Sequence, residues 1–443
     1  MNTPICEFVK NYNSQNPLRL HMPGHKGKGF LGVENLDITE VFGADSLYEA
    51  DGIIAESEAN ASKLFDCPTF YSTEGSSQCI RAMVRLAMLH SFKQGKIPKI
   101  AAGRNAHKTF LSAAALLNTD VVWLSSDDEN GYLSCNFTPQ ELEKIIHDEN
   151  ITAVYLTSPD YLGNMADISL AAEICHKNNV LLLVDNAHGA YLHFLQKSFH
   201  PMDLGADICC DSAHKTLPVL TGGAYLHIRD EILAKDAKEA LALFGSTSPS
   251  YLILQSLDAA NLYLENYPEL LSEFIPKVEK CKEDLRKIGW TLYGNEVLKI
   301  TLCPKNRGYS GEELAEILLK NNIVCEFADP DYLVLMLTPE ITSEDLQKLK
   351  SVLTLEKKEA ILQKAPSAVK CPQKITPRQA MLSVSETIDV ENSLGRIMSA
   401  PSVGCPPAVP IVLCGQEITQ EAIAAFRYYG IKTCKVVASF AEI

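Results

Sequence analysis

Lys215 stands in a polar stretch, residues 211–216, that is flanked by two apolar runs. Residues 208–210 precede the stretch, and residues 224–228 follow it after a pair of glycines. This pattern predicts a strand, a polar turn and a second strand, with the lysine displayed in the turn. An amine held there could form a Schiff base with a carbonyl group bound beside it. Most lysines are solvated surface charges, so the stretch indicates a site only together with other groups.

Asp185 supplies a second chemical group, at the end of another apolar run thirty positions earlier. A pyridoxal phosphate site needs both groups: a lysine for the aldehyde and a carboxylate that keeps the pyridine nitrogen protonated. The alternative for Asp185 is an ordinary turn residue at a strand end, which is a common role for aspartate.

Gly75, Ser76 and Ser77 lie where a short strand pattern gives way to a helical one over residues 78–90. Glycine lets the backbone turn sharply, and a helix start presents unpaired N–H groups and a positive dipole end. The two hydroxyls add donors, so the segment suits a phosphate group. A Gly-Ser-Ser sequence by itself would more often be a simple helix cap.

Several separated motifs make the chain resemble the Orn/Lys/Arg decarboxylase family of fold-type-I pyridoxal-phosphate enzymes. Ser-Ala-His-Lys-Thr, residues 212–216, resembles the family's lysine motif, and Leu-His-Met-Pro-Gly-His-Lys-Gly, residues 20–27, is close to its opening motif. The similarity runs from about residue 17 to 230. Further matching stretches are residues 37–40, residues 43–47 and, more weakly, Gly395-Arg396 and Cys405-Pro406-Pro407.

The resemblance implies a role for each candidate site residue. Lys215 would bind the cofactor aldehyde and Asp185 would pair with the pyridinium. His107 would stack on one face of the ring and Ala187 would pack on the other. His188 would either orient the substrate carboxylate or fill the site wall, and both readings stay open. The implied catalytic residues are Lys215, Asp185, His107 and His188, and the implied cofactor contacts are Gly75, Ser76, Ser77, His107, Asp185, Ala187, Ser212, His214 and Lys215.

The elements that must position these residues read as an α/β fold. Apolar runs at residues 121–124, 153–156 and 181–184 alternate with helical patterns, which predicts a mostly parallel sheet covered on both faces. Residues 57–65 and 250–267 also read as helices, and residues 323–327 read as a strand. Ligand sites of such sheets lie beyond the carboxyl ends of the strands, where Asp185 falls. The resemblance implies a fold-type-I large domain with a sheet of seven strands. We expect an N-terminal arm (residues 1–30), a pyridoxal-phosphate-binding large domain (31–290), a small α+β domain (291–370) and a C-terminal decarboxylase-family domain (371–443).

Composition narrows the functional classes. A chain of 443 residues that is 46% hydrophobic can bury the cores of several domains. It has no long apolar run, and residues 1–10 lack a signal core, so we expect no membrane span and a cytoplasmic location. Fourteen cysteines without C-x-x-C spacing argue against a disulfide framework and a zinc ribbon, and we expect no metal. The net charge of −15 disfavours nucleic acid and mildly favours cationic ligands, although solubility alone is an equal explanation.

These expectations combine into one function. The chain should decarboxylate a basic amino acid, arginine or lysine before ornithine, with pyridoxal phosphate, and feed polyamine metabolism. It should form a homodimer or a higher homo-oligomer, because in this family the N-terminal arm reaches toward the active site of a dimer. The alternatives are another fold-type-I reaction, such as an aldolase or aminotransferase, and a catalytically silent pyridoxal-phosphate-binding regulatory homologue. One departure stands out: family members usually have Pro-Gly-Glu where this chain has Cys414-Gly415-Gln416.

Overall fold

The computed structural model describes residues 1–124, 132–401 and 409–439. Its backbone contacts divide the chain into two compact units, each assembled from two separate segments. The first unit comprises Met1–Lys96 and Leu181–Leu271, and the second comprises Ile97–Val180 and Ser272–Ile443. Of the motifs singled out above, Cys405-Pro406-Pro407 lies outside the described residues.

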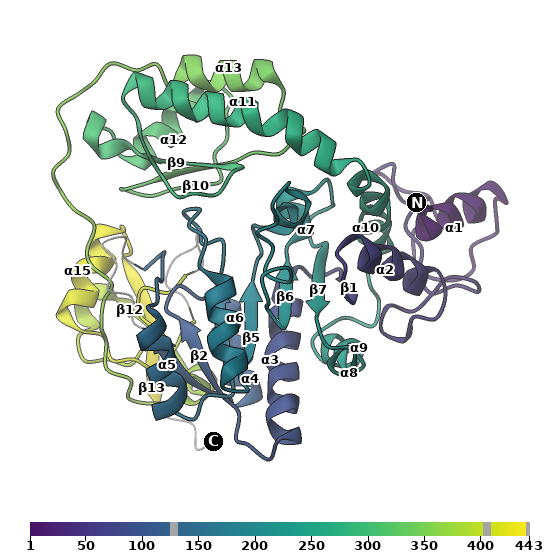
Figure 1. Ribbon diagram of the computed structural model, residues 1–443, viewed down its shortest axis with the longest axis horizontal. Helices are drawn as coiled ribbons and strands as arrows, with labels where there is room; N and C mark the ends of the chain where they lie inside the picture. Colours follow the sequence, from purple (N-terminus) through teal and green to yellow (C-terminus); the bar gives the residue numbers. More distant parts are fainter. Residues whose placement is uncertain (125–131, 402–408, 440–443) are drawn as a thin grey trace. The chain divides into compact units, whose positions relative to one another are not determined.

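A seven-stranded sheet has the strand order β1-β7-β6-β5-β4-β2-β3 (Figure 1). Strand β7 is antiparallel to β1 and β6, whereas the pairs β5–β6, β2–β4 and β2–β3 are parallel. Strands β5, β6 and β7 are buried almost throughout, as expected for apolar strands covered on both faces. The predicted mostly parallel sheet is therefore confirmed. The strands are β1 (Thr69–Ser72), β2 (Lys99–Gly103), β3 (Asp120–Leu124), β4 (Ala153–Thr157), β5 (Leu181–Asp185), β6 (Ile208–Asp211) and β7 (Ala224–Ile228).

In the first unit, helix α3 packs against β6 and β7, and α2 packs against α1 and α10. Helix α2 begins at Ile53, four residues before the predicted start, because the carboxylate of Asp45 accepts hydrogen bonds from the N–H groups of Gly52, Ile54 and Ala55. These are donors that a helix start otherwise leaves unpaired. The helices of this unit are α1 (Pro4–Ser14), η1 (Leu47–Glu49), α2 (Ile53–Leu64), α3 (Ser76–Lys93), η2 (Ala190–Phe194), α7 (Ala213–Thr216), α8 (Glu231–Ala234), α9 (Ala237–Ala242) and α10 (Tyr251–Leu264).

The second unit contains an antiparallel sheet of four strands in the order β10-β11-β9-β8, with α12 and α13 on one side of it (Figure 1). A strand predicted over residues 323–327 is wrong, since of these residues only Phe327 belongs to a strand. The N–H of Ile323 instead bonds to the carbonyl of Leu318 and completes the end of α12. The elements here are β8 (Thr291–Tyr293), β9 (Lys299–Cys303), η3 (Pro304–Arg307), α12 (Gly311–Lys320), β10 (Phe327–Ala328), β11 (Leu333–Met336) and α13 (Ser343–Val352). Also in this unit are α4 (Lys108–Leu117), α5 (Pro139–Asp148) and α6 (Ile168–Lys177), while α11 (Tyr267–Ile288) begins in the first unit and ends in the second.

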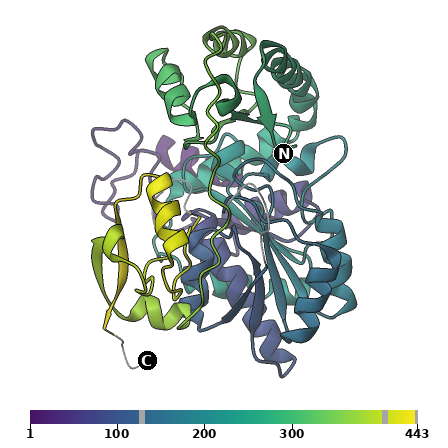
Figure 2. The same ribbon diagram turned by 90° about the vertical axis from the view of Figure 1, so that its left-hand side faces the viewer.

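The C-terminal part of the second unit forms a small layer of its own, drawn in yellow and yellow-green in Figure 2. Strands β12 (Val384–Asp389) and β13 (Thr433–Ser439) pair antiparallel, beside α14 (Pro377–Leu382), η4 (Val390–Asn392) and α15 (Gln420–Tyr428). Phe426 of α15 and Val436 of β13 share one buried apolar cluster with Phe327 and Val334 of the four-stranded sheet. This shared cluster joins the tail to the four-stranded sheet.

None of the helices in the described parts of the chain is long and apolar enough to cross a membrane.

Candidate active site

Lys215 lies on α7, a single helical turn directly after β6. The predicted polar turn between the two strands is therefore wrong in detail, because residues 213–216 are helical. The turn is closed by hydrogen bonds from the N–H of Lys215 to the carbonyl of Ser212 and from the N–H of Leu217 to the carbonyl of Ala213. A helical turn fixes the backbone of the lysine more tightly than an open loop would.

His188 is a polar partner of the lysine. Its Nε2 atom is 2.9 Å from the Nζ atom of Lys215, and its side chain is buried. His188 follows β5, and Lys215 follows β6, its parallel neighbour. The carboxyl ends of parallel neighbours meet at one edge of a sheet, which is why residues 27 positions apart meet here.

Asp185 is the last residue of β5 and is only 2% exposed. Its carboxylate accepts hydrogen bonds from the N–H of Ala187 at 3.2 Å and from the Sγ atom of Cys210 at 3.7 Å. A buried carboxylate is stable only when it is hydrogen bonded or paired with a cation. Its position and burial suit a protonated ring nitrogen.

The Gly-Ser-Ser segment forms the start of α3. Gly75 is its N-cap residue, with φ of 72°, and no side chain caps the helix there. The N–H of Gly75 donates to the carbonyl of Gly222 at 2.7 Å, which ties the helix start to the loop after α7. The Oγ atom of Ser212 donates to that of Ser76 at 2.8 Å. The structure thus brings together two of the predicted phosphate-binding hydroxyls from segments 136 positions apart.

Three further predicted residues lie in the same unit. His214 holds the loop after α7, since its Nδ1 atom is 3.0 Å from the carbonyl oxygen of Gly223. Ser77 lies in the first turn of α3, and Ala187 lies between Asp185 and His188. The donor set of this unit fits pyridoxal phosphate: an amine, a buried carboxylate, paired hydroxyls and a helix start.

His107 is the one predicted site residue that lies in the second unit. It is the N-cap residue of α4, where its Nδ1 atom accepts a hydrogen bond from the N–H of Thr109 at 3.2 Å and is 2.9 Å from the Oγ1 atom of Thr109. An Nδ1 atom that accepts leaves the proton of a neutral ring on Nε2. Its stacking role stays a prediction.

Sequence reasoning gave Arg104 no role, although it stands three positions before His107. Its guanidinium donates to the carbonyls of Pro410 at 2.7 Å and Ile411 at 2.5 Å. Burial lowers the pKa of this guanidinium to about 10. Arg104 therefore holds the C-terminal segment beside the loop of His107, and its sequence surroundings, with Asn105, His107 and Lys108, gave no signal for this role.

The Cys414-Gly415-Gln416 departure forms a turn in this C-terminal segment. The Oε1 atom of Gln416 accepts a hydrogen bond from the N–H of Leu413 at 2.9 Å, and the Sγ atom of Cys414 donates to the carbonyl of Ser399 at 3.1 Å. Both side chains are buried. Gln416 therefore closes this turn, whereas Cys414 connects the turn to Ser399.

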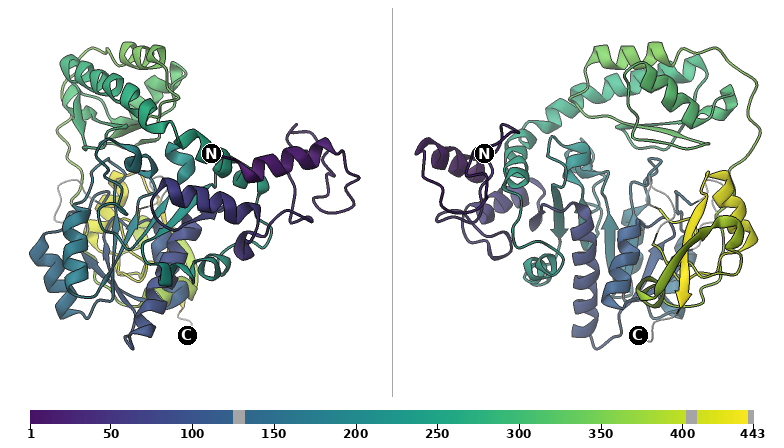
Figure 3. Two further views of the ribbon diagram at one scale, coloured as in Figure 1. Left: turned by 45° about the vertical axis from the view of Figure 1, so that its right-hand side comes forward. Right: turned by 180° about the vertical axis from the view of Figure 1, so that it is seen from behind.

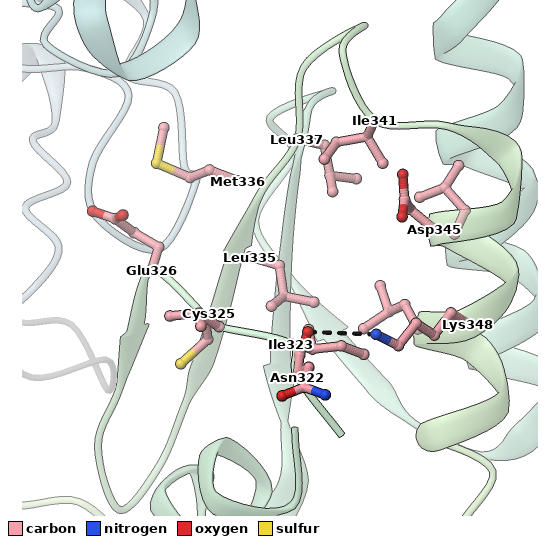
Figure 4. Close-up of a pocket in the computed structure, with 13 residues that line it drawn as sticks. Asn322, Ile323, Cys325, Glu326, Leu335, Met336, Leu337, Ile341, Asp345 and Lys348 are labelled. Carbon is pink, nitrogen blue, oxygen red and sulfur yellow. Dashed lines mark hydrogen bonds between the residues drawn. The ribbon is translucent and has the colours of Figure 1, made fainter. Parts of the chain in front are cut away.

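A cavity of about 450 Å³ lies elsewhere, in the second unit, between α13 and the β11 region (Figure 4). Its wall is largely apolar, with Leu335, Leu337 and Ile341 on view, and none of the predicted site residues lines it. Its charged groups serve local structure: Lys348 donates to the carbonyl of Asn322, and Asp345 closes the start of α13. This cavity carries no catalytic constellation.

Comparisons with known proteins agree with the geometry of the first unit. The family described as Orn/Lys/Arg decarboxylase, major domain, matches residues 3–303. An arginine decarboxylase of Halalkalibacterium halodurans is 29% identical over 96% of this chain and 93% of its own length. An arginine decarboxylase of Bacillus subtilis is 28% identical over 95% of this chain and 92% of its own length. The solved constitutive lysine decarboxylase of E. coli superimposes with a TM-score of 0.79 at 16% identity, over 98% of this chain and 82% of that one. At that identity the superposition speaks for the fold alone, and it confirms the predicted fold class.

Proposed function

Because the chain belongs to the Orn/Lys/Arg decarboxylase family, we propose that its substrate is arginine, with lysine second and ornithine third. The family's reaction is the decarboxylation of a basic amino acid with pyridoxal phosphate, and the chain is such an enzyme. The order of substrates rests on the arginine decarboxylases that match more than nine tenths of the chain. The observation that carries the site assignment is that Lys215 and the buried Asp185 follow neighbouring strands of one compact unit.

Pyridoxal phosphate, when bound, supplies a protonated ring that accepts the electron pair of the breaking Cα–carboxylate bond. Asp185 would keep that ring protonated, because a buried carboxylate strongly favours a cationic partner. The N–H groups at the start of α3, with the Oγ atoms of Ser76 and Ser212, would hold the phosphate. Lys215 would bind the aldehyde carbon through its Nζ atom.

His188 would exchange a proton with the amine of Lys215. The 2.9 Å contact between His188 Nε2 and Lys215 Nζ is within proton-transfer distance. Imidazole changes its charge near neutral pH, so it can take a proton from an ammonium group and return it. This assignment replaces the two open readings of His188 with one that its contact supports.

We also propose that the enzyme is a homodimer. Residues 15–46, drawn in purple after α1 in Figure 3, contain no helix or strand. Contiguous exposed apolar surface usually marks a protein interface. The exposed apolar side chains of this segment are Leu18, Leu20, Met22, Phe30, Leu31, Val33, Leu36 and Phe42. A second copy of the chain is the occupant that we propose for these side chains.

We also keep three further expectations as proposals. They are the domain boundaries at residues 30, 290 and 370, the cytoplasmic location and the place in polyamine metabolism.

The test of function compares substrates. Purified enzyme with pyridoxal phosphate is given arginine, lysine, ornithine, citrulline or norleucine, and released carbon dioxide and amine are measured together. Arginine should exceed citrulline in kcat/KM by ~10²-fold or more, since a polar pocket built for a cation is left unpaired by a neutral isostere. A neutral amino acid as the best substrate would show the proposal to be wrong. Transfer of the amino group to a keto acid without carbon dioxide would instead point to an aminotransferase.

A further inference from the structure

A fully buried charged cluster lies at the carboxyl end of β6, around Asp211. The Oδ2 atom of Asp211 is 3.1 Å from the Nε2 atoms of both His200 and His227. Its Oδ1 atom accepts a hydrogen bond of 2.7 Å from the Nδ2 atom of Asn186. Burial opposes ionisation of Asp211, but the two histidines outweigh burial and hold the pKa of its carboxyl well below the ordinary value.

The hydrogen bonds of the cluster fix where its protons sit. A carboxylate only accepts, so both Nε2 atoms must carry hydrogen. The Nδ1 atom of His227 is 3.0 Å from the Oγ1 atom of Thr69, whose hydroxyl also lies 3.0 Å from the carbonyl oxygen of Cys67. Both ring nitrogens of His227 are therefore held by hydrogen bonds.

His200 is also held through both ring nitrogens. Its Nδ1 atom accepts a hydrogen bond from the N–H of Met202 at 3.4 Å, so the ring is neutral. Burial lowers the pKa of His200, in agreement with this assignment. The cluster therefore holds a buried carboxylate that accepts hydrogen bonds from two imidazole rings. A buried carboxylate of this kind is stable only while its hydrogen bonds are made.

The cluster connects the two strands that carry the reacting groups. Asn186 directly follows Asp185, which is the last residue of β5. Asp211 is the last residue of β6 and lies four positions before Lys215. The Oδ1 atom of Asn186 is buried and has no hydrogen-bond partner among the described residues. The side-chain amide of Asn186 is therefore committed to Asp211.

We propose that Asp211, ionised and hydrogen bonded to His200 and His227, is a positioning residue that sets the Asp185 carboxylate relative to Lys215 through Asn186. The proposal rests on the proposed function only in treating Asp185 and Lys215 as the reacting pair. Asp211 contacts neither of the groups assigned to the cofactor and acts through its neighbours. The alternative is that the cluster stabilises the fold without setting the active-site geometry.

Asp211→Asn separates these two roles. The new amide places its NH2 group either against both histidine N–H groups or against the side-chain amide of Asn186, so the cluster must rearrange. The matched control is Glu58→Gln, which removes a buried carboxylate of the same unit that pairs with Lys238 at 2.6 Å. Asp211→Asn should lower kcat by about 10- to 100-fold with KM within about threefold, as small displacements of reacting groups do. Glu58→Gln should lower Tm but leave kcat within about twofold, as expected for a carboxylate away from the reacting groups.

Equal kcat losses in the two variants, or an unchanged kcat in Asp211→Asn, would overturn the positioning role. Neutron diffraction from wild-type crystals without cofactor tests the proton assignment separately, even if the variant fails to fold. Hydrogen should appear on the Nε2 atoms of both His200 and His227 and not on the carboxylate of Asp211. A protonated Asp211, or a metal ion among these ligands, would overturn the proposal. Neither neutron result depends on decarboxylation, so failure of the proposed function would be recognised separately by the substrate comparison.

Discussion

Asp185 shows how one side chain can combine a structural and an electrostatic role. Asp185→Asn keeps an oxygen that can accept from the N–H of Ala187, but it removes the negative charge that would hold a proton on the ring nitrogen. We therefore predict that this variant retains pyridoxal phosphate, measured by absorbance titration, while kcat falls by at least ~10²-fold. A kcat within a few-fold of the wild type would mean that another group pairs with the ring.

Single residues differ in how well sequence reveals them. Lys215 and Asp185 could be predicted because Asp185 directly follows an apolar run that reads as a strand, and Lys215 stands in the polar stretch after another such run. His200, His227 and Asn186 could not be connected with Asp211, because they lie 11 to 25 positions from it and meet through strand pairing. Their only sequence signal is a polar side chain beside or within apolar runs, which many unrelated positions share.

Among the elements, the loop after α7 depends on glycine. Gly222 has φ of 103°, and a Cβ atom there would lie 2.9 Å from the carbonyl oxygen of Thr73. Gly222→Ala should destabilise the fold by about 1–3 kcal/mol from backbone strain alone, and the clash should add to this cost. It should also weaken cofactor binding, since the carbonyl of Gly222 holds the N–H of Gly75.

Gly95→Ala is the matched control, measured by the same thermal melts and cofactor titrations. Gly95 also has a positive φ, of 70°, but a Cβ atom there would meet nothing within 4 Å. It should lower Tm by less than Gly222→Ala and leave cofactor affinity unchanged. If the two variants lose stability and affinity equally, the contact with Thr73 is unimportant.

The apolar pattern of the sequence alone predicts the elements in which that pattern repeats over many residues. The strands of the large sheet and helices such as α3 and α10 lie close to where the sequence places them. The one-turn helix α7 was missed because four residues are too few to show a helical period. Residues 323–326 were misread as a strand because their apolar side chains hide a helix end, which a hydrogen bond to Leu318 creates.

At the scale of the whole molecule, the exposed segment after α1 predicts assembly. Phe30 and Phe42 are fully exposed in the single chain, and the other large apolar residues are less exposed. Light scattering should give a dimer for the wild type. The double variant with Phe30→Asp and Phe42→Asp should have a dimer dissociation constant raised by more than ~10²-fold, as expected when charges enter an apolar interface.

Phe92→Asp is the control for this prediction, because Phe92 is a half-exposed residue near the end of α3. It should leave the dimer intact. A wild-type monomer, or equal weakening by all the substitutions, would contradict the assignment of this segment as an interface.

The division of the chain into two units could not be predicted from sequence. Each unit joins segments that are far apart in the chain, so composition shifts and linkers do not mark its limits. The broad class could be predicted, because alternating strand and helix patterns leave few architectures other than a mostly parallel sheet. His107 illustrates the difference, since its motif was recognised but its place in the second unit was not.

The central claim is that Lys215 is the amine that binds pyridoxal phosphate, and borohydride tests it most directly. The holoenzyme is reduced, digested and analysed by mass spectrometry, with Lys215→Ala treated in parallel. The account predicts one pyridoxyl group per chain, located on Lys215, and none in the variant, in which kcat also falls to background. A pyridoxyl group on Lys26, Lys108 or any other lysine of the wild type would contradict it.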